Sequence, residues 1–133
     1  MKNLIPDRYP IFTAKAANGV GSPMIVADSN NISVKLVTSG NANMTIKFQG
    51  SLQATAPDFS AAASTTNQWD FINFADYLDA GTLTAGGTGI ITGGVDVFKN
   101  ILLNTDGLVW INVQISNWVA GAATAEGVVF YNQ

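Results

Sequence analysis

One segment of the chain, residues 107–119, alternates strictly between two kinds of side chain. The apolar series is Val109, Ile111, Val113 and Ile115, and the intervening series is Trp110, Asn112, Gln114 and Ser116. Because successive side chains of a strand point to opposite faces, this pattern predicts a strand with one buried face and one polar face. We therefore expect the chain to be built from strands.

The composition limits the chemistry that such a fold can carry. The 133 residues include neither histidine nor cysteine, so histidine-based triads, disulfides and thiolate metal sites are excluded. Charged residues make up 11% of the chain, against about 25% in average globular proteins. A surface so poor in charge is favoured where copies of the chain or a larger assembly cover it.

The charges also bear on the expected partners. The formal net charge is -3, and the six basic residues are scattered along the chain, which argues against a nucleic-acid partner. No apolar run approaches the ~20 residues of a membrane-spanning helix, and the N-terminus has no apolar core of signal-peptide length. We expect no membrane association, and a protein that is made and kept in a cytosol unless it leaves as part of a particle.

Strand signals continue along most of the chain. We expect residues 1–9 to form an N-terminal arm and residues 10–133 to form one β-domain. Alternation in residues 32–36 and 44–48, with Ser39–Ala42 between them, predicts a hairpin. Asp106-Gly107 predicts a second hairpin, between strands 95–103 and 108–119.

The remaining segments complete the predicted architecture. Residues 53–67, rich in Ala, Ser and Thr, are expected to form a long surface loop. Residues 68–78 predict a strand that breaks near Ala75, and residues 128–131 a terminal strand after a loop at 121–127. About eight short strands without a convincing helix indicate an all-β, antiparallel sandwich of jelly-roll type.

Three aspartates within ten residues, Asp70, Asp76 and Asp79, are candidates for chemistry. Paired carboxylates hydrolyse glycosidic bonds, and Asp70 and Asp76 would share a face of a strand. Asp76 and Asp79 also flank a turn before Gly81, where aspartate is favoured, and we prefer this interpretation. The pattern matches no calcium loop. We expect no catalytic residue, metal or cofactor.

The glycine-rich segment 84–89 is the second candidate. No lysine follows its glycines and no helix is expected after them, although phosphate-binding loops need both features. We interpret it as a flexible turn.

The tryptophans are candidates for contacts with partners. Core packing is the simplest role for Trp69 and Trp118, whereas Trp110 lies opposite the apolar face and would contact a covering layer, a protein partner or a sugar. In the sugar-binding alternative, Asn112 or Gln114 would bind hydroxyl groups. Interface candidates are Phe12, Trp110 and Trp118.

The second half of the chain also carries a resemblance. Trp69-Asp70-Phe71-Ile72, the glycine-rich turns and the strand Trp110-Ile111-Asn112-Val113-Gln114-Ile115-Ser116 are similar to small β-sandwich virion proteins of tailed bacteriophages. That group includes capsid decoration (cement) proteins and head or tail surface proteins, and the similarity spans residues 67–125.

The resemblance implies a non-enzymatic subunit of the virion. Such a subunit would bind the major capsid protein or another virion protein, often as a homo-oligomer such as a trimer. The alternatives are a carbohydrate-binding module that uses Trp110 and a glycosidase that uses Asp70 and Asp76.

Overall fold

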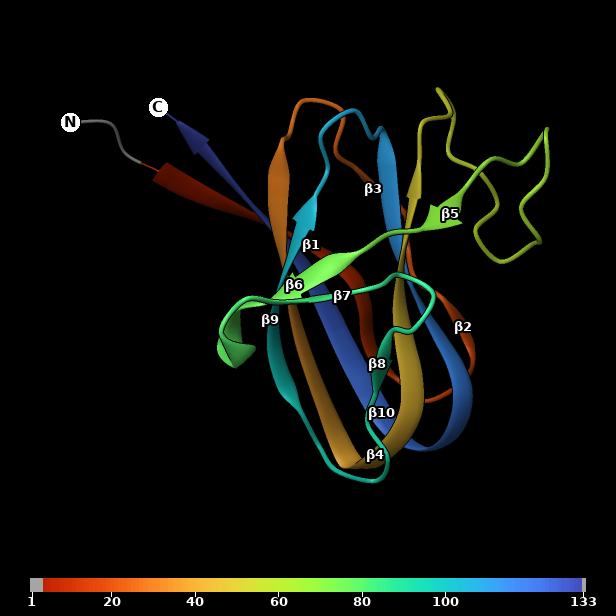
Figure 1. Cartoon of the computed structure of the whole chain (residues 1–133), viewed down its shortest axis with the longest axis vertical. Helices are drawn as coiled ribbons and strands as arrows, with labels where there is room; N and C mark the ends of the chain where they lie inside the picture. Colours follow the sequence, from red (N-terminus) through yellow and green to blue (C-terminus); the bar gives the residue numbers. More distant parts are fainter. Residues whose placement is uncertain (1–3, 133) are drawn as a thin grey trace.

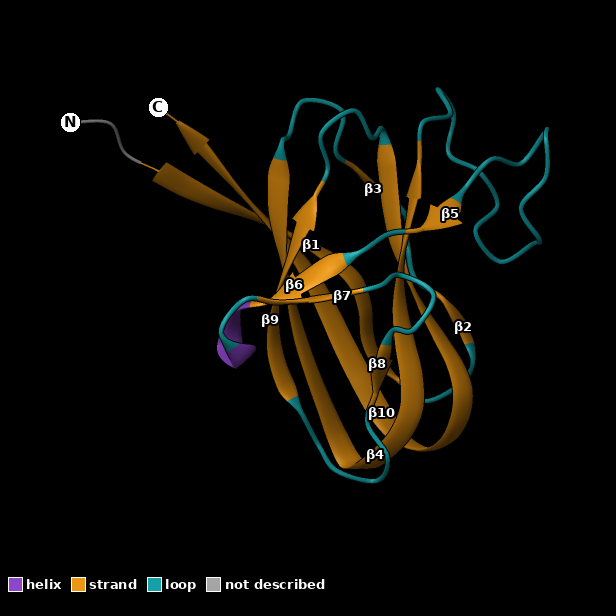
Figure 2. Ribbon diagram, viewed as in Figure 1, coloured by secondary structure: helices purple, strands orange, loops and turns teal. Residues whose placement is uncertain are grey.

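The fold is a single antiparallel sheet that bends back on itself. The computed structural model describes the backbone of residues 4–132 and the side chains of residues 7–129. Within this range the strands form one ten-stranded sheet, and the helical structure is a single 3-10 turn (Figure 2). The prediction of an all-β chain is confirmed. The elements are β1 (Leu4–Lys15), β2 (Gly19–Val20), β3 (Met24–Ile25), β4 (Asn31–Ser51), β5 (Asp70–Phe71), β6 (Phe74–Asp76), η1 (Tyr77–Asp79), β7 (Thr82–Thr84), β8 (Ile90–Ile91), β9 (Phe98–Asn104) and β10 (Trp110–Asn132).

Two long strands, β4 and β10, run through the whole body. They pair antiparallel from Trp110↔Ser51 to Val128↔Ser33, and both bend midway (Figure 1). On one side of the bends lies the open half, in the order β1-β10-β4-β9-β6-β7. On the other side lies the covered half, where β2 and β3 pair with β10, and β5 and β8 pair with β4.

One hydrophobic core lies between the two halves. Even-numbered residues of β4 face it on both sides of the bend, as odd-numbered residues of β10 do. The predicted apolar face of residues 107–119 is confirmed at Ile111, Val113 and Ile115, each at most 1% exposed. A two-residue repeat that continues through a bend keeps both halves of a strand on the same core. The β4 residues concerned are Ile32, Val34, Leu36, Met44, Ile46 and Phe48.

The bend of β4 corrects the first predicted hairpin. Residues 39–42 do not reverse the chain, because residues 33–39 and 43–51 both pair with β10 and not with each other. Gly40 and Asn41 have φ of 76° and 56°, and they meet the bend of β10 at Gly121, whose φ is 83°. A Cβ on Gly121 would lie 2.6 Å from Ala42 Cα, so the two bends pack backbone against backbone.

The second hairpin and the terminal strand are also corrected. β9 pairs with β4, from Asn31↔Asn104 to Val37↔Phe98, and its register includes no residue of β10. The turn at 104–107 instead takes the chain from the open half to the covered half, and the Thr105 N–H anchors it to Asn30 O at 2.8 Å. The expected loop at 121–127 and strand at 128–131 are both part of β10.

The beginning of β1 and the end of β10 leave the body together. β10 pairs with β4 as far as Val128, and residues 129–132 pair with residues 4–7 of β1. These eight residues form the terminal ribbon, which projects from the body at the upper left of Figure 1. Of the expected arm, residues 1–3 lie outside the described residues and residues 4–9 are the first part of β1.

Candidate interaction surface

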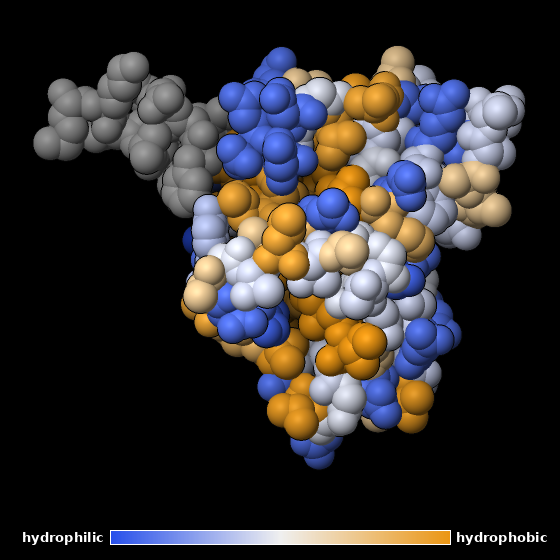
Figure 3. All heavy atoms as spheres, in the orientation of Figure 1, coloured by the Kyte–Doolittle hydropathy of each residue, from blue (hydrophilic) through white to orange (hydrophobic). Residues whose placement is uncertain are grey.

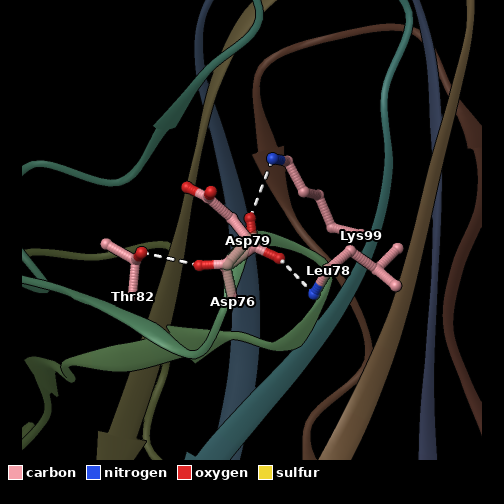
Figure 4. A network of polar contacts seen from close by, with 5 residues as sticks. All are labelled: Asp76, Leu78, Asp79, Thr82 and Lys99. Atoms are coloured by element: carbon pink, nitrogen blue, oxygen red, sulfur yellow. Dashed lines mark hydrogen bonds and ion pairs between the residues drawn. The ribbon is translucent and has the colours of Figure 1, made fainter.

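The aspartate cluster holds a turn. Asp76 is 7% exposed, accepts a hydrogen bond from the Leu78 N–H at 3.1 Å through Oδ1, and pairs with Lys99 Nζ at 2.8 Å through Oδ2 (Figure 4). Asp79 contributes its backbone carbonyl, which accepts from the Thr82 hydroxyl at 2.6 Å. Both oxygens of Asp76 are therefore engaged in capping η1 and in holding β6 against β9.

Asp70 lies in a different part of the sheet. It is exposed in β5, which pairs with β4 in the covered half, whereas β6 carries Asp76 into the open half. Among the described residues, no three acidic, histidine or cysteine side chains gather in a way that could hold a metal ion. The turn interpretation thus accounts for the contacts of Asp76 and Asp79.

The glycine-rich segment forms a packed turn between β7 and β8. A Cβ on Gly86 would lie 2.7 Å from the backbone of Ile72, and the Gly86 N–H donates to Asn73 Oδ1 at 2.8 Å. Gly89 has φ of 69°, and a Cβ there would lie 2.6 Å from Ile46 O. Glycine at these positions allows close approach of backbone to backbone.

The loop between β5 and β4, residues 52–69, packs onto the outer face of the covered half. Phe59 is 2% exposed, and its carbonyl accepts from Gln49 Nε2 at 3.0 Å. Asn67 holds the loop closed by accepting from the Asp58 N–H and donating to Asp58 O, each at 2.8 Å. The Ser60 hydroxyl, followed by the Ser60 N–H, lowers the pKa of Asp58. The expected surface loop is present, with an ordered network of its own.

The same loop contacts two of the three tryptophans. Trp69 stacks edge-on against Phe71, with ring centroids 5.1 Å apart, and its indole N–H donates to Ala61 O at 2.9 Å. The Trp110 indole N–H points to Ala54 O at 3.4 Å, so the loop lies against this side chain. Trp118 packs against the core, and its indole N–H donates to Gly121 O at 2.9 Å.

The other residues predicted to contact partners or sugars also have neighbours within the chain. Phe12 is 9% exposed and belongs to the hydrophobic core. Asn112 is 1% exposed and donates to Gly21 O at 2.9 Å, whereas Gln114 is partly buried opposite Lys47. The interface role of Phe12, Trp110 and Trp118 stays a prediction, and the sugar-binding arrangement lacks an accessible Asn112.

The carboxylate of Asp96, in the segment before β9, binds the backbone at the bend of β4. Asp96 accepts from the N–H groups of Ala42 and Asn41, at 2.9 and 3.2 Å, and from the Thr38 hydroxyl. The Ala42 N–H is the largest cause of the lowered pKa of Asp96, because it stabilises the ionised carboxylate. Thr92 adds a buried hydroxyl that donates to Ala42 O at 2.7 Å.

Exposed apolar side chains gather where the sequence predicted none. Ten large apolar side chains in residues 7–129 are at least 36% exposed, and six of them fall between residues 77 and 98. We call the following set the apolar flank, which lies on η1, β8, the chain entering β9 and the facing part of β4: Val37, Tyr77, Leu78, Ile91, Val95 and Phe98. Figure 3 shows apolar side chains distributed over the face that carries β7 and β8.

The surface also has a hollow, lined by other residues, that we call the apolar groove. It encloses about 700 Å³ between β6, β7, the end of β9 and the turn at 104–108. Its apolar lining includes Phe71, Ile72, Leu83, Leu102 and Leu108, and its polar lining includes Asn31, Asn73, Asn104 and Asp106. A smaller hollow of about 380 Å³ adjoins it at Ile72 and Leu108, beside Trp69. The groove combines segments far apart in the sequence, so no local motif could have indicated it, whereas every residue of the flank except Val37 lies between residues 77 and 98.

The fold defines a class of protein: a small all-β chain whose first and last strands leave the body as one ribbon. A particular protein with this fold is the SPBc2 prophage-derived protein YomS. Its crystal structure matches with a TM-score of 0.71 and 13% sequence identity, over 98% of this chain and 97% of that chain. Identity this low shows a shared fold alone. No protein-family model matches the chain, and no curated protein matches it in sequence. In the described residues there is no helix of the length and apolarity that crossing a membrane requires.

Proposed function

We propose that the chain is a non-enzymatic structural subunit of a bacteriophage virion, and specifically a decoration subunit that binds the capsid surface and stabilises the particle. It would be made in the host cytoplasm and act in the assembled virion. Its main partner would be the major capsid protein.

The observation that carries this proposal is the apolar flank. Phe98 and Ile91 are 54% and 70% exposed, and Val37 lies directly opposite Phe98 in the β4–β9 register. Exposed apolar patches rimmed by polar residues mark surfaces that another protein covers, and aromatic side chains anchor such interfaces. An exposed apolar surface with an aromatic anchor suits attachment to a lattice.

Two further observations support the phage setting. The chain shares its fold over nearly the full length of both proteins with a protein described as prophage-derived. Its second half also resembles virion proteins in the strand around Trp110 and the preceding glycine-rich turns. The sugar-binding alternative has less support, because Asn112 is buried and Trp110 lies against the chain's own loop.

Co-sedimentation with phage particles tests the proposal. Purified wild-type protein, added to particles of the encoding phage that lack it, should pellet with them in a fixed ratio to the major capsid protein and raise their resistance to heat. Phe98→Asp should reduce this binding at least tenfold, since a desolvated charge replaces an aromatic anchor.

Ile25→Asp is the matched control, because Ile25 is 56% exposed but lies on β3, which pairs with β10 and carries no residue of the apolar flank. It should bind like the wild type. The proposal fails if wild-type protein stays in the supernatant, or if both substitutions weaken binding equally.

A further inference from the structure

A hollow on the outer face of the open half is lined by two cations and, among the described residues, by no acidic side chain. We call it the basic hollow. It encloses about 210 Å³, and its lining consists of Arg8, Ser33, Lys35, Phe98, Asn100 and Val128. Pockets for drug-sized ligands enclose roughly 300–1,000 Å³, so the basic hollow suits a single side chain or a small ion.

The strand registers place the side chains of the basic hollow in adjacent rows. Each row joins residues that lie directly opposite each other on neighbouring strands: Arg8, Val128 and Ser33 in the first row, and Glu126, Lys35 and Asn100 in the second. Phe98 lies in the third row, opposite Val37. Side chains that are opposite or diagonal on one sheet face are close enough to contact a shared ligand. Because strands carry all of these residues, their relative positions are fixed by the sheet.

The two cations of the basic hollow differ in their own partners. Arg8 Nη1 pairs with Glu126 Oε1 at 2.6 Å, and a guanidinium has further N–H groups that can bind a second acceptor. Lys35 is exposed, and the described residues place no acidic group within ion-pair distance of its ammonium, although Glu126 lies directly opposite it in the register. The charge of Lys35 is therefore left without a counter-charge.

The neighbouring acidic residue of β1 does not belong to the basic hollow. Asp7 lies opposite Val129 on the other face of the strand, and its Oδ2 accepts from the Tyr9 hydroxyl at 2.9 Å. The charges of Arg8, Lys35 and Glu126 leave a local excess of one positive charge, in a chain whose formal net charge is -3. One acidic group is the complement of this surface.

Two neutral donors and two apolar side chains complete the lining. Within the part of the chain that the structure describes, the side chains of Asn100 and Ser33 make no hydrogen bond, and both can donate to a carboxylate. Val128 and Phe98 form the apolar part of the lining, and Phe98 also belongs to the apolar flank. A carboxylate on a short alkyl stem matches both parts of the lining.

A carboxylate fits the basic hollow better than a phosphate does. A phosphate monoester carries about -1.5 to -2 charges at pH 7, and the second charge would face Glu126 without a cation to balance it. One carboxylate balances the charge of Lys35 alone. A free phosphate also lacks an apolar part that could contact Phe98 and Val128.

We propose that the basic hollow binds the carboxylate of an aspartate or glutamate side chain of a partner protein, with Lys35 as its counter-charge and Arg8 and Asn100 as further donors. This inference rests on the proposed function and deepens it, because Phe98 lines the hollow and belongs to the flank that the partner covers. The partner therefore presents an acidic residue beside the apolar residue that contacts Phe98. Charge complementarity of this kind fixes the register of an interface and accelerates association.

Co-sedimentation with phage particles tests the pairing on the partner. Lys35→Glu should weaken binding at least about tenfold, because a like charge would then face the partner's carboxylate. Lys47→Glu is the matched control, since it changes the net charge equally but lies on the covered half, where the Lys47 ammonium is 4.8 Å from the centre of the Phe71 ring. It should bind like the wild type, and circular dichroism would verify that both variants fold.

The neutral variant Lys35→Gln removes the charge without placing a second acid beside Glu126. It should bind particles more weakly than the wild type in low salt, and the difference should shrink in high salt, because counterions screen the pair. The inference is overturned if Lys35→Glu binds like the wild type, or if Lys35→Glu and Lys47→Glu weaken binding equally.

Titration with propionate tests the basic hollow without particles. Propionate has the carboxylate and the alkyl stem of an acidic side chain, so it should shift the backbone N–H resonances of Ser33, Lys35 and Asn100 in a saturable way. Propionamide, its neutral analogue, should shift none of them, and Lys35→Gln should lose the response. No response in the wild type, an undiminished response in Lys35→Gln, or tighter saturation by inorganic phosphate would each overturn the inference.

The two experiments separate this inference from the proposed function. A saturable response to propionate in a wild-type protein that fails to pellet with particles would support the carboxylate site while overturning the decoration role. Wild-type and Lys35→Glu proteins that pellet equally would keep the decoration role and overturn the carboxylate site.

Discussion

The outer faces of the two halves of the sheet differ in what covers them. On the covered half, residues 52–69 lie over the sheet, and the outward-facing Gln49 and Asn112 are at most 1% exposed. On the open half, Lys35 and Phe98 remain exposed, and a hollow of about 210 Å³ lies between them and Arg8. The same two long strands thus carry one outer face that residues 52–69 cover and another outer face that is available to other proteins. Polar residues on a strand therefore do not show which face meets solvent.

The largest expected effect concerns the bends that join the halves. Gly121→Ala should lower the free energy of unfolding by about 3 kcal/mol or more, because it combines a left-handed backbone with contacts of 2.6 Å to Ala42 and Ser39. Gly107→Ala is the control, since its φ of 82° is nearly the same but the space around it is open. It should cost about 1 kcal/mol. Urea denaturation would compare them, and equal losses would show that the packing of the bends is unimportant.

The next prediction contrasts the two faces directly. Phe59→Ala should destabilise the protein by about 3 kcal/mol, because Phe59 is 2% exposed beneath the loop. Phe98→Ala, at a side chain 54% exposed, should change stability by no more than about 0.5 kcal/mol. Hydrogen exchange should also speed up across residues 52–69 in the first variant alone. A large loss for Phe98→Ala would mean that the open face is not free.

The pH dependence of stability should report on Asp96, which binds the bend of β4 between the two halves. The pKa of Asp96 is lowered in the folded protein, mainly by the Ala42 N–H, from an ordinary value of 3.8. A lowered folded pKa means that the ionised carboxylate stabilises the fold above pH 3.8 and that this contribution is lost as pH falls below that value.

Asp96→Asn should therefore have a lower Tm than the wild type by a constant amount above about pH 5, and the difference should shrink on acidification. Thermal unfolding followed by circular dichroism would measure it. A difference that is independent of pH would rule out the charge as its source.

The smallest effect is expected for an ion pair on the open face. Arg8 and Glu126 lie 2.6 Å apart, with side chains 55% and 32% exposed. Arg8→Gln should cost at most about 0.5 kcal/mol, and less in high salt, because solvent screens exposed pairs. Urea titrations at low and high salt would test this. A larger, salt-independent loss would indicate that Arg8 is shielded from solvent.

Much of the local structure could be predicted from the sequence. The two-residue repeat identified the buried residues Ile111, Val113 and Ile115, and the composition of residues 53–67 indicated the long loop. The turn role of Asp76 also followed from its spacing to Asp79 and Gly81, although the pairing with Lys99 did not. These features depend on neighbours in the chain, which is why local patterns reveal them.

The first predicted hairpin, at residues 39–42, was wrong for a physical reason. Gly40 and Asn41 adopt positive φ, as residues of a hairpin turn do, so the local signal is the same for a reversal and for a bend. Pairing with β10 on both sides of residues 39–42 determines that β4 bends there and does not reverse. The groove was missed because it joins side chains from segments that are distant in the sequence. The flank lies mainly within residues 77–98, and it was missed because its exposure depends on what the rest of the chain covers.

By itself, the sequence determined an all-β chain, a core on one side of its strands, and a stability that rests on packing without disulfides. Only the tertiary structure decided that two strands bend and continue, that Asn112 is buried and a loop lies against Trp110, and that residues 4–7 and 129–132 form a ribbon. Alternation specifies which side of a strand is buried, whereas pairing between distant strands specifies which strand lies next to it and what remains exposed.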